Sequence, residues 1–358
     1  MNTNQLDTTR LAEHIKAWGQ ALGFQQVGIT DTDLSEAERH LDDWLRKGFH
    51  GDMDYMHKHG LKRSRPALLQ PGTRRVISVR MDYLPEPTDA MTRTLEQPLT
   101  AYISRYALGR DYHKVLRQRL QKLAERIERE IGPFGYRVFV DSAPVLEKAL
   151  AEKAGLGWIG KHSNLINRKA GSWFFLGEIY TDLELPVDEK ADEHCGRCTA
   201  CLEICPTRAI VAPYRVDARL CVSYLTIELH GSIPEPLRPL IGNRIYGCDD
   251  CQIVCPWNRF ARLTDEGDFN PRRQLDSQQL IEVFAWNETT FLNHTEGSAI
   301  RRIGHERWLR NIAVALGNAP YSASIVSALQ TRLEHPSDMV KEHVQWALTR
   351  QIDKQPTH

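Results

Sequence analysis

Apolar residues recur at helical spacing in two long segments of the first half of the chain, and short apolar runs lie between them. Residues 6–22 and 113–131 each place their leucines and isoleucines on one side of a helix. The runs 27–30, 76–83, 136–140 and 173–185 predict strands, and Pro144 is expected to open a further helix that ends at Gly155. This alternation predicts an α/β (α+β) domain over residues 1–188.

The second half of the chain changes character twice. Residues 189–260 form short cysteine-rich segments with too few apolar residues to fold without a metal, which predicts a bacterial-ferredoxin-like domain. Residues 261–358 return to helical spacing, with helices expected at 307–316, 322–333 and 340–350. Paired short helices of this kind predict an all-α HEAT-like repeat, and a plain helical cap on the core is the alternative.

Composition sets limits and does not name a partner. The 358 residues carry 46 Lys plus Arg and 46 Asp plus Glu, and 41% are hydrophobic, which is typical of a globular protein. No apolar run reaches the roughly 18 residues needed to cross a bilayer. Residues 1–18 are polar with a helical period and are unlike a signal peptide. We therefore expect a cytoplasmic protein with no membrane partner.

All eight cysteines lie between Cys195 and Cys255, although a secreted disulfide framework would spread them over the fold. Clustering of this kind indicates metal ligands. The first run has the spacing C-x2-C-x2-C-x3-C-P of bacterial ferredoxins, in which three thiolates hold one 4Fe-4S cluster and the fourth reaches another. The second run, C-x2-C-x3-C-P, lacks one cysteine, which Cys221 alone is left to supply.

The usual crossing of ligands divides these cysteines between two 4Fe-4S clusters. Cluster one is assigned Cys195, Cys198, Cys201 and Cys255, and cluster two is assigned Cys205, Cys221, Cys248 and Cys251. Two structural zinc sites are the alternative, because tetrahedral zinc also binds C-x2-C pairs. Zinc ribbons use two separated pairs, whereas three cysteines at x2, x2 spacing surround one cluster, so the spacing favours iron and sulfide.

Two further motifs fail on their context. The segment 155–160 matches G-x-G-x-x-G but follows a predicted helix, and His162 stands where a Walker A loop needs Ser or Thr. We expect its glycines to end the helix and to let the backbone approach a large ligand. The segment 111–113 begins like the D-x-H-x-x-G motif of proteins whose histidine ligates cobalt, but Leu116 replaces the glycine.

Several motifs together resemble the epoxyqueuosine reductase family. They are SRYALGRDYH at 104–113, VDSAPVLE at 140–147, GLGWIGKHSN at 155–164, CVSYLTIEL at 221–229, YGCDDC at 246–251 and the two cysteine runs. The resemblance covers nearly the whole chain, and the motifs taken jointly are highly specific. It implies a cobalamin enzyme that removes the epoxide oxygen of epoxyqueuosine in the anticodon loop of tRNA, giving queuosine.

The implied chemistry agrees with what the cysteines indicate. Clusters pass single electrons, and a two-electron deoxygenation needs a partner that accepts them one at a time, as cobalt in a corrin does. The failed cobalt motif predicts that no protein histidine ligates the cobalt. An external one-electron donor is implied, and we expect the protein to act as a monomer.

The resemblance also implies roles for residues in the matching motifs. Corrin contacts are expected from Arg63, Ser104, Asp141, Lys161, Ser163, Asn164, Ser223 and Asp249, each of which could instead be a solvated or capping residue. Ser223 and Asp249 stand beside cysteines of cluster two, so they would touch the corrin if this cluster is the nearer one.

Asp141 is predicted to be the general acid. It follows the strand 136–140, at the end where α/β sheets present ligand-binding groups. Opening an epoxide leaves an alkoxide that needs a proton, and desolvation beneath a corrin would raise the pKa of this carboxyl toward neutrality. Tyr106 is the alternative donor, and a capping role for Asp141 or Ser142 at the next helix is the structural alternative.

Two groups of basic residues predict a tRNA-binding surface, because phosphate contact needs local and not net positive charge. The first lies between Tyr55 and Met81 with no acid among them: Lys58, Lys62, Arg63, Arg65, Arg74, Arg75 and Arg80. The second is Arg301, Arg302, Arg307 and Arg310, beside the single acid Glu306. A solvated basic face is the alternative.

Two other functions fit part of the pattern. A reductive dehalogenase would share the two-cluster arrangement, but residues 1–30 contain no twin-arginine export signal. A cluster-only electron carrier would need neither a large α/β domain before the cysteines nor a helical repeat after them. The sequence therefore favours the epoxyqueuosine reductase family.

Overall fold

The structure, a computed structural model, describes residues 7–356, so the predicted helix start at Leu6 lies outside it. A four-stranded sheet in the order β1-β2-β7-β4 organises the N-terminal part. Its strands are β1 (Gln26–Thr30), β2 (Arg75–Asp82), β4 (Tyr136–Phe139) and β7 (Phe174–Thr181). All neighbouring pairs are antiparallel, so this part is α+β. The strand-end argument for Asp141 is therefore wrong, because it holds for parallel sheets.

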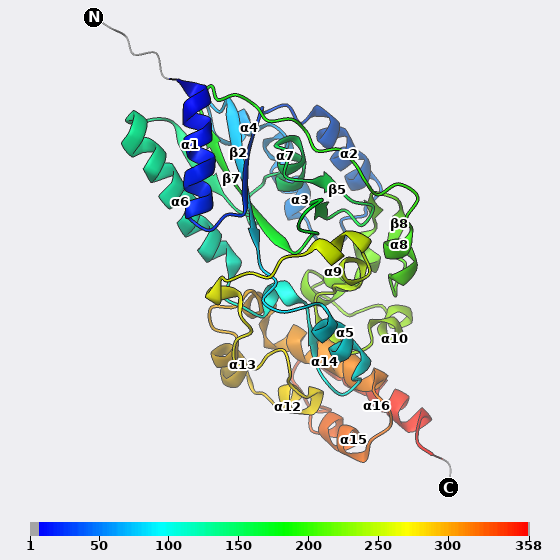
Figure 1. The fold of residues 1–358 in the computed structure, drawn as a ribbon. Helices are drawn as coiled ribbons and strands as arrows, with labels where there is room; N and C mark the ends of the chain where they lie inside the picture. Colours follow the sequence, from blue (N-terminus) through cyan, green and yellow to red (C-terminus); the bar gives the residue numbers. More distant parts are fainter. Residues whose placement is uncertain (1–6, 357–358) are drawn as a thin grey trace, which may run out of the picture.

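Helices cover both faces of this sheet (Figure 1). The helices of this part of the chain are α1 (Thr8–Ala21), α2 (Ser35–Arg46), α3 (Tyr55–Lys58), α4 (Pro66–Leu69), α5 (Asp89–Glu96), α6 (Tyr112–Ile131) and α7 (Glu147–Lys153). Of these, α5 lies away from the sheet, beside the short strand β3 (Tyr102–Ile103) (Figure 1). α1 and α6 pack on one face, where Ile15, Leu120 and Ile179 share a buried core. α7 packs on the other face, in a core with Leu150 and Tyr180. Since both faces are covered, every residue of β7 is buried.

The predicted helices at 6–22 and 113–131 and the predicted strands at 27–30, 76–83 and 136–140 are confirmed within a few residues. The helix expected from Pro144 and the strand expected at 173–185 are shorter than predicted. Pro144 does not open a helix, because backbone hydrogen bonds between Val140, Ala143 and Val145 form a turn and α7 begins three residues later. The last strand ends at Thr181 instead of residue 185, where the Thr181 hydroxyl accepts a hydrogen bond from the Leu183 backbone.

The cysteine-rich segment consists of short elements. They are α8 (Ala200–Ile204), β8 (Ile210–Ala212), β9 (Arg215–Val216), α9 (Val222–Ile227), α10 (Arg238–Ile241), β10 (Arg244–Tyr246) and α11 (Asp250–Ile253). The small strands β3 (Tyr102–Ile103), β5 (Trp158–Ile159) and β6 (Leu165–Ile166) lie earlier in the chain, and 3-10 turns include η2 (Arg105–Ala107), η5 (Pro256–Phe260) and η7 (Ala299–Ile303).

The C-terminal part is helical, as predicted. Its helices are α12 (Leu280–Phe284), α13 (Glu288–His294), α14 (Gly304–Asn318), α15 (Ala323–Gln330) and α16 (Asp338–Asp353). α14 is the central helix and packs most extensively on α16 (Figure 1). The HEAT-like repeat stays a prediction. No helix within residues 7–356 is long and apolar enough to span a membrane.

The division into 1–188, 189–260 and 261–358 also stays a prediction, and the packing crosses its boundaries. β3 pairs in parallel with β10 of the cysteine-rich segment. Ile103 and Leu108 share a buried core with Phe284 and Trp308 of the C-terminal helices. The segment 99–110 therefore joins the three parts, and this path carries Ser104 and Tyr106 to the central cavity described below.

Candidate active site

The eight cysteines gather into two groups of four. The outer group, Cys195, Cys198, Cys201 and Cys255, lines a cavity of about 170 Å³. The inner group, Cys205, Cys221, Cys248 and Cys251, lines part of a larger cavity of about 440 Å³. The structure thus brings together the same two sets that the crossing of ferredoxin ligands predicts.

The backbone conformation at the last cysteine of each run explains why these cysteines join the other group. Cys201 lies within α8, and the chain leaves the helix at Cys205, whose backbone is extended. Cys255 follows α11 with the same extended backbone. Each of these two cysteines precedes a proline, which disfavours the helical conformation in the residue before it. The last cysteine of each run is therefore turned away from its own helix and toward the other group.

Sulfur separations bear on the zinc alternative. Four sulfurs around one zinc ion lie about 3.8 Å apart, because each Zn–S bond is about 2.3 Å long. Across the described part of the chain, which includes every cysteine, no three of these sulfurs lie mutually within 4.8 Å. Wider sulfur–sulfur separations fit a four-iron, four-sulfur cluster, in which each thiolate binds a different iron atom.

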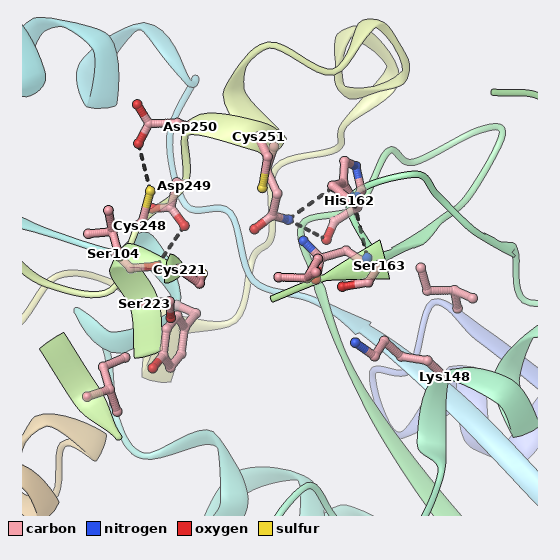
Figure 2. A pocket seen from close by; sticks show the side chains of 18 of the residues that line it. Ser104, Lys148, His162, Ser163, Cys221, Ser223, Cys248, Asp249, Asp250 and Cys251 are labelled. Carbon is pink, nitrogen blue, oxygen red and sulfur yellow. Dashed lines mark hydrogen bonds between the residues drawn. The ribbon is translucent and has the colours of Figure 1, made fainter. Parts of the chain in front are cut away.

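The larger cavity has two walls from different parts of the chain. Figure 2 shows Cys248, Asp249 and Ser223 of the cysteine-rich segment on one side and His162 and Ser163 across from them. Apolar side chains make up much of the remaining lining, and they include Phe174, Phe175, Leu176, Val222 and Ile227. The cavity therefore combines apolar surface with polar groups from both walls.

Asp141 borders this cavity just after β4. The Tyr112 hydroxyl donates a hydrogen bond to its Oδ2, and Nε2 of His113 lies 3.4 Å from the same oxygen. Desolvation raises the pKa of Asp141, but the bonds from His113 and Tyr112 outweigh it and hold the pKa below its usual value. These two donors come from α6 and oppose the rise toward neutrality that is expected beneath a corrin, which stays a prediction. No side chain caps α7, so Asp141 does not serve as its cap.

His113 is a second acid–base group at this site, and the sequence-based prediction omits it. Its Nδ1 lies 2.7 Å from Oδ1 of Asp111, and its ring stacks on Tyr112 at 4.1 Å. Desolvation lowers the pKa of His113, but the bonds to Asp111 and Asp141 raise it to about 9. The imidazole is therefore protonated at neutral pH. Its sequence signal is the Asp-Tyr-His run at the start of α6, where Asp111 is the N-cap.

Tyr106 lines the cavity and contacts the edge of Tyr112, with ring centroids 6.0 Å apart. Burial raises the pKa of Tyr106 well above its usual value. Its phenol is therefore neutral and able to donate a hydrogen bond, as the role of alternative donor requires.

Ser104 and Asp249 line the cavity but are bound to each other. Oγ of Ser104 donates to Asp249 at 2.6 Å, and Tyr102 and the backbone of Arg105 donate to the same carboxylate at 2.7 and 2.8 Å. This carboxylate fastens β3 to the loop that carries Cys248. Ser223 also lines the cavity, beside Cys221.

The expected contacts at 161–164 divide between the two cavities. Ser163 and Asn164 line the larger one, and Ser163 has a φ of 65°, in the left-handed region. Lys161 lines the smaller one, and its Nζ donates to the carbonyls of Gly196 and Cys198 at 2.7 and 2.9 Å. The structure therefore places Lys161 with the outer group.

The glycines of the segment 155–160 serve the chain's own packing. A Cβ at Gly155 would lie 2.6 Å from the carbonyl oxygen of Glu189, and one at Gly157 would lie 2.2 Å from that of Ile166. The expectation that they admit a large ligand is wrong, because neighbouring backbone fills the space. Gly155 does end the helix region, with a φ of 74°.

Arg63 is buried beside the cavity and does not line it within the described chain. Its guanidinium donates to the carbonyl of Tyr55 at 2.8 Å. Desolvation lowers the pKa of Arg63, and the charges of Tyr55 and Asp141 act against that shift. Arg63 therefore sits close enough to Asp141 for the two charges to interact.

Known proteins share this architecture. The family model described as "Epoxyqueuosine reductase QueG, DUF1730" matches residues 63–142, and that of a 4Fe-4S double cluster binding domain matches residues 194–258. An epoxyqueuosine reductase of Pseudomonas aeruginosa is 65% identical, over 98% of this chain and 97% of that protein. The chain belongs to the epoxyqueuosine reductase family. The predicted family is thus confirmed, and the chain is an oxidoreductase.

Other epoxyqueuosine reductases support the assignment. That of Escherichia coli K12 is 63% identical, over 98% of this chain and 92% of that protein. A crystal structure of a selenomethionine-labelled epoxyqueuosine reductase superposes with a TM-score of 0.88 at 26% identity, covering 96% of this chain and 91% of that one. Another, with an epoxyqueuosine-modified tRNA-Tyr stem loop, has a TM-score of 0.87 with the same identity and coverage. The dehalogenase and electron-carrier alternatives are set aside.

The second basic group of this reductase is only partly available to a ligand. Arg310 is fully buried, and its guanidinium donates to the carbonyls of Leu225, Leu229 and Gly231. Its predicted tRNA contact is wrong, because those donors are already used inside the protein. Arg307 is half-buried and likewise donates to backbone carbonyls.

Arg301 and Arg302 are both exposed. Arg302 pairs with Glu228 at 2.6 Å and lines the larger cavity. These two arginines therefore remain the accessible cations of the second group.

The first basic group is also divided. Lys58 and Lys62 are exposed, whereas Arg80 is buried in an ion pair with Asp82 at 2.9 Å. Arg65 pairs with Glu38, and Arg74 and Arg75 pair with Glu184. Burial raises the pKa of Tyr55 to about 12; the charges of Glu228 and Asp141 add to this rise, and that of Arg302 opposes it. The segment 55–63 therefore lies beside η7 and the cavity.

Proposed function

We propose that this enzyme reduces epoxyqueuosine to queuosine in a tRNA anticodon loop, as the final step of queuosine biosynthesis, with cobalamin that two 4Fe-4S clusters supply with electrons. The observation that carries the proposal is the cavity of about 440 Å³ that joins the inner cysteine group to Asp141. A cofactor and substrate bound in this cavity could receive electrons from the inner cluster and a proton from Asp141.

The two cysteine groups differ in a way that supports an electron path. Cys198 of the outer group is exposed, whereas no cysteine of the inner group is. An external one-electron donor would therefore reduce the outer cluster, which passes the electron to the inner cluster. The inner cluster would be the one nearer to cobalt, beside the expected corrin contact Ser223.

The residues around the cavity fit a corrin. A flat macrocycle with amide side chains needs apolar surface and scattered hydrogen-bond partners, and Phe174, Leu176, Ser163 and Ser223 offer both. Cobalamin, when bound, would supply a metal centre that takes up single electrons and gives two to the substrate. Ser163, Asn164 and Ser223 would hold its periphery, and Ser104 and Asp249 would support that wall from behind.

His162 strengthens this fit. Its ring is buried, and Nδ1 accepts a hydrogen bond from the Asn164 backbone at 3.1 Å. Burial lowers the pKa of His162 to about 4, so the ring is neutral and its proton sits on Nε2. That atom has no partner within residues 7–356. An N–H donor suits a bound amide or carboxyl group and cannot ligate a metal, in keeping with the expectation that no protein histidine holds cobalt.

Asp141 is the proposed general acid, and its neighbours prepare it for that role. Tyr112 and His113 orient the carboxylate, and His113 holds a proton at neutral pH that it can pass to Asp141 for delivery to the substrate. Substrate in the cavity displaces water around Asp141, which favours its neutral form. Tyr106 is the alternative donor.

The tRNA would bind across the open side of the cavity. Arg301, Arg302, Lys58 and Lys62 lie on segments beside it and offer charge to backbone phosphates. The relative that was crystallised with an epoxyqueuosine-modified stem loop supports this substrate. The HEAT-like part 261–358 would grip the stem, with the enzyme acting as a cytoplasmic monomer.

The decisive experiment uses protein reconstituted with iron, sulfide and cobalamin, with metal contents measured. It is incubated with tRNA that carries epoxyqueuosine and with a one-electron reductant, and the nucleosides are then analysed by mass spectrometry. We expect queuosine, which lacks one oxygen atom, with turnover lost when cobalamin is omitted. Absence of conversion by fully loaded protein would overturn the proposal, and conversion without cobalamin would remove the corrin from it.

A further inference from the structure

A row of buried polar atoms crosses the sheet on the side of Asp141. Ser78, Glu178 and Tyr180 are all 0% exposed. Oγ of Ser78, both carboxyl oxygens of Glu178, the hydroxyl of Tyr180 and Oε2 of Glu147 have no hydrogen-bond partner within the described chain. Buried polar groups are nearly always paired, so several orphans on neighbouring strands and α7 require an explanation.

Strand register puts these groups on one face. Glu178 of β7 lies directly opposite Ser78 of β2 and Phe139 of β4, and residues opposite each other in antiparallel strands share a face. Tyr180 is two residues further along β7 and points the same way. α7 packs on this face, with Phe139 and Tyr180 in its core. Glu178 therefore lies beneath the segment that joins β4 to α7.

Glu147 connects this interior to the active site. It is the first residue of α7 and lines the larger cavity together with Asp141, whereas Glu178 does not line it. Asp141 stands two residues beyond Phe139, the strand partner of Glu178. The order from interior to cavity is thus Glu178, Glu147 and Asp141.

The surroundings of these carboxyl groups favour their neutral forms. Desolvation and the charges of Glu147 and Asp141 raise the pKa of Glu178 well above its usual value. Desolvation and Asp141 raise the pKa of Glu147 to about 8, and the cations Lys148 and His113 act against this shift without cancelling it. Ser78 and Tyr180 are the neutral groups beside Glu178, and Arg302 faces Asp141.

A purely structural role does not explain Glu178. Its neighbours on this face include Val76, Phe139 and Leu150, so an aliphatic side chain would pack there without leaving polar atoms unpaired. An unsatisfied buried polar group destabilises the folded state. Costly titratable groups of this kind concentrate at sites where proton transfer is needed.

We propose that Glu147 and Glu178 form an internal proton store that reloads Asp141 during the reaction. The inference rests on the proposed function, because converting the epoxide into an alkene breaks two C–O bonds and consumes two electrons and two protons, and the oxygen leaves as water. Asp141 with His113 gives one proton, and Glu147 gives the other through Asp141 and is refilled from Glu178. Both protons are then present in the enzyme before substrate seals the cavity, and the electrons come by way of the clusters.

The first test does not depend on turnover. Infrared difference spectra of the loaded enzyme in H₂O and D₂O report protonated carboxyl groups through their carbonyl band. We expect such a band at neutral pH with contributions from both glutamates, so Glu147→Gln and Glu178→Gln should each weaken it. A wild-type spectrum without the band, or an unchanged band in both variants, would overturn the proton store whatever the activity.

The second test is the pH profile of a single turnover. Glu147→Gln and Glu178→Gln keep the shape of the side chains, so we expect iron, cobalamin and tRNA binding to persist. The rate should fall by about 10²-fold at neutral pH, where both carboxyl groups of the wild type hold their protons. Glu184→Gln, on the exposed surface, is the matched control and should behave as wild type. If Glu178→Gln fails to fold, Glu147→Gln at the cavity wall still decides the question.

The outcomes separate the two proposals. If wild-type enzyme does not reduce epoxyqueuosine, the proposed function fails, and the infrared band is judged on its own. If wild-type enzyme turns over and both glutamate variants match its rate across pH, the function stands and the proton store is wrong.

Discussion

The inner and outer cysteine groups each combine members of the two cysteine runs, yet they stand in different surroundings. The outer group includes the exposed Cys198 and shares its cavity with Lys161 and Trp257. The inner group has no exposed member and shares its cavity with Asp141 and Tyr106. Spacing alone therefore defines a cluster ligand set, whereas the neighbouring elements decide whether a cluster receives electrons or delivers them.

The surroundings differ in chemistry as well as in depth. The outer group packs on aromatic rings, with Trp158 and Trp257 in an edge-to-face contact at 5.1 Å, and Lys161 holds its loop through two carbonyls. Around the inner group, Arg244 pairs with Asp250 beside Cys248. The outer surroundings hold a loop in place, and the inner ones tie the cluster loop to the cavity wall.

The largest effect is expected from breaking the inner group. Cys221→Ala should lower bound iron by about half, because one four-iron cluster is lost. It should abolish reduction of cobalt by an external donor while cobalamin still binds. Iron analysis and the visible spectrum of bound cobalamin measure both quantities.

Cys198→Ala is the matched variant in the outer group. It should lose a similar amount of iron but retain reduction of cobalt by a small, strong reductant that can reach the inner cluster directly. Normal cobalt reduction in Cys221→Ala, with the inner cluster shown to be absent, would reverse the assignment of near and far clusters.

A second, smaller effect is expected at Asp141, which lines the same cavity as the inner group. Asp141→Asn removes the transferable proton and keeps the shape, so turnover should fall by about 10²- to 10⁴-fold. Both clusters, cobalamin and tRNA should still bind. Turnover near the wild-type rate across pH would make Asp141 structural and leave Tyr106 or water as the proton donor.

Features that depend on residues close together in the sequence could be predicted, whereas contacts between distant segments could not. Seven of the eight cysteine ligands follow from spacings of a few residues and the proline after each run, and Cys221 follows as the one cysteine that remains. The burial of Arg310 could not be predicted, because the carbonyls that surround it lie 79 to 85 residues earlier in the chain. A basic run in a sequence does not show which of its members the fold uses internally.

The same limit applies to Asp141 and to the sheet. Periodicity predicted α6 as a helix, but it could not show that the start of α6 meets the end of β4, where Tyr112 and His113 lower the pKa of Asp141. The antiparallel order β1-β2-β7-β4 joins strands up to about 100 residues apart in sequence. Local patterns therefore predicted the elements, and long-range pairing decided the electrostatics of the site.

The third prediction concerns the pH dependence of the Asp141 side of the cavity. The pKa of His113 is raised from 6.5 to about 9. Its ion pairs therefore stabilise the site fully below pH 6.5 and are lost as the pH rises through about 9. In the pH profile, turnover should therefore fall by about 10-fold as the pH rises through about 9, and His113→Gln should remove this alkaline fall.

Cluster content supplies the control for this titration. The visible absorption of both clusters should stay constant from pH 6.5 to about 9, since the partners of His113 are Asp111 and Asp141 and not a cysteine. If the alkaline fall in turnover persists unchanged in His113→Gln, another group causes it.

The smallest effect is expected from charge reversal at the protein surface. This change tests whether tRNA binds only beside the inner group. Arg301→Glu reverses one exposed charge beside the larger cavity. Each lost phosphate contact lowers affinity modestly, so tRNA binding should weaken by about 3- to 5-fold and the slope of log affinity against log salt should fall by about 1. Arg197→Glu is the matched reversal in the exposed loop of the outer group, and it should leave tRNA affinity unchanged. Equal losses in both variants across a salt series would mean that the tRNA footprint covers the two cysteine groups alike, and the functional contrast between them would then rest on the electron path alone.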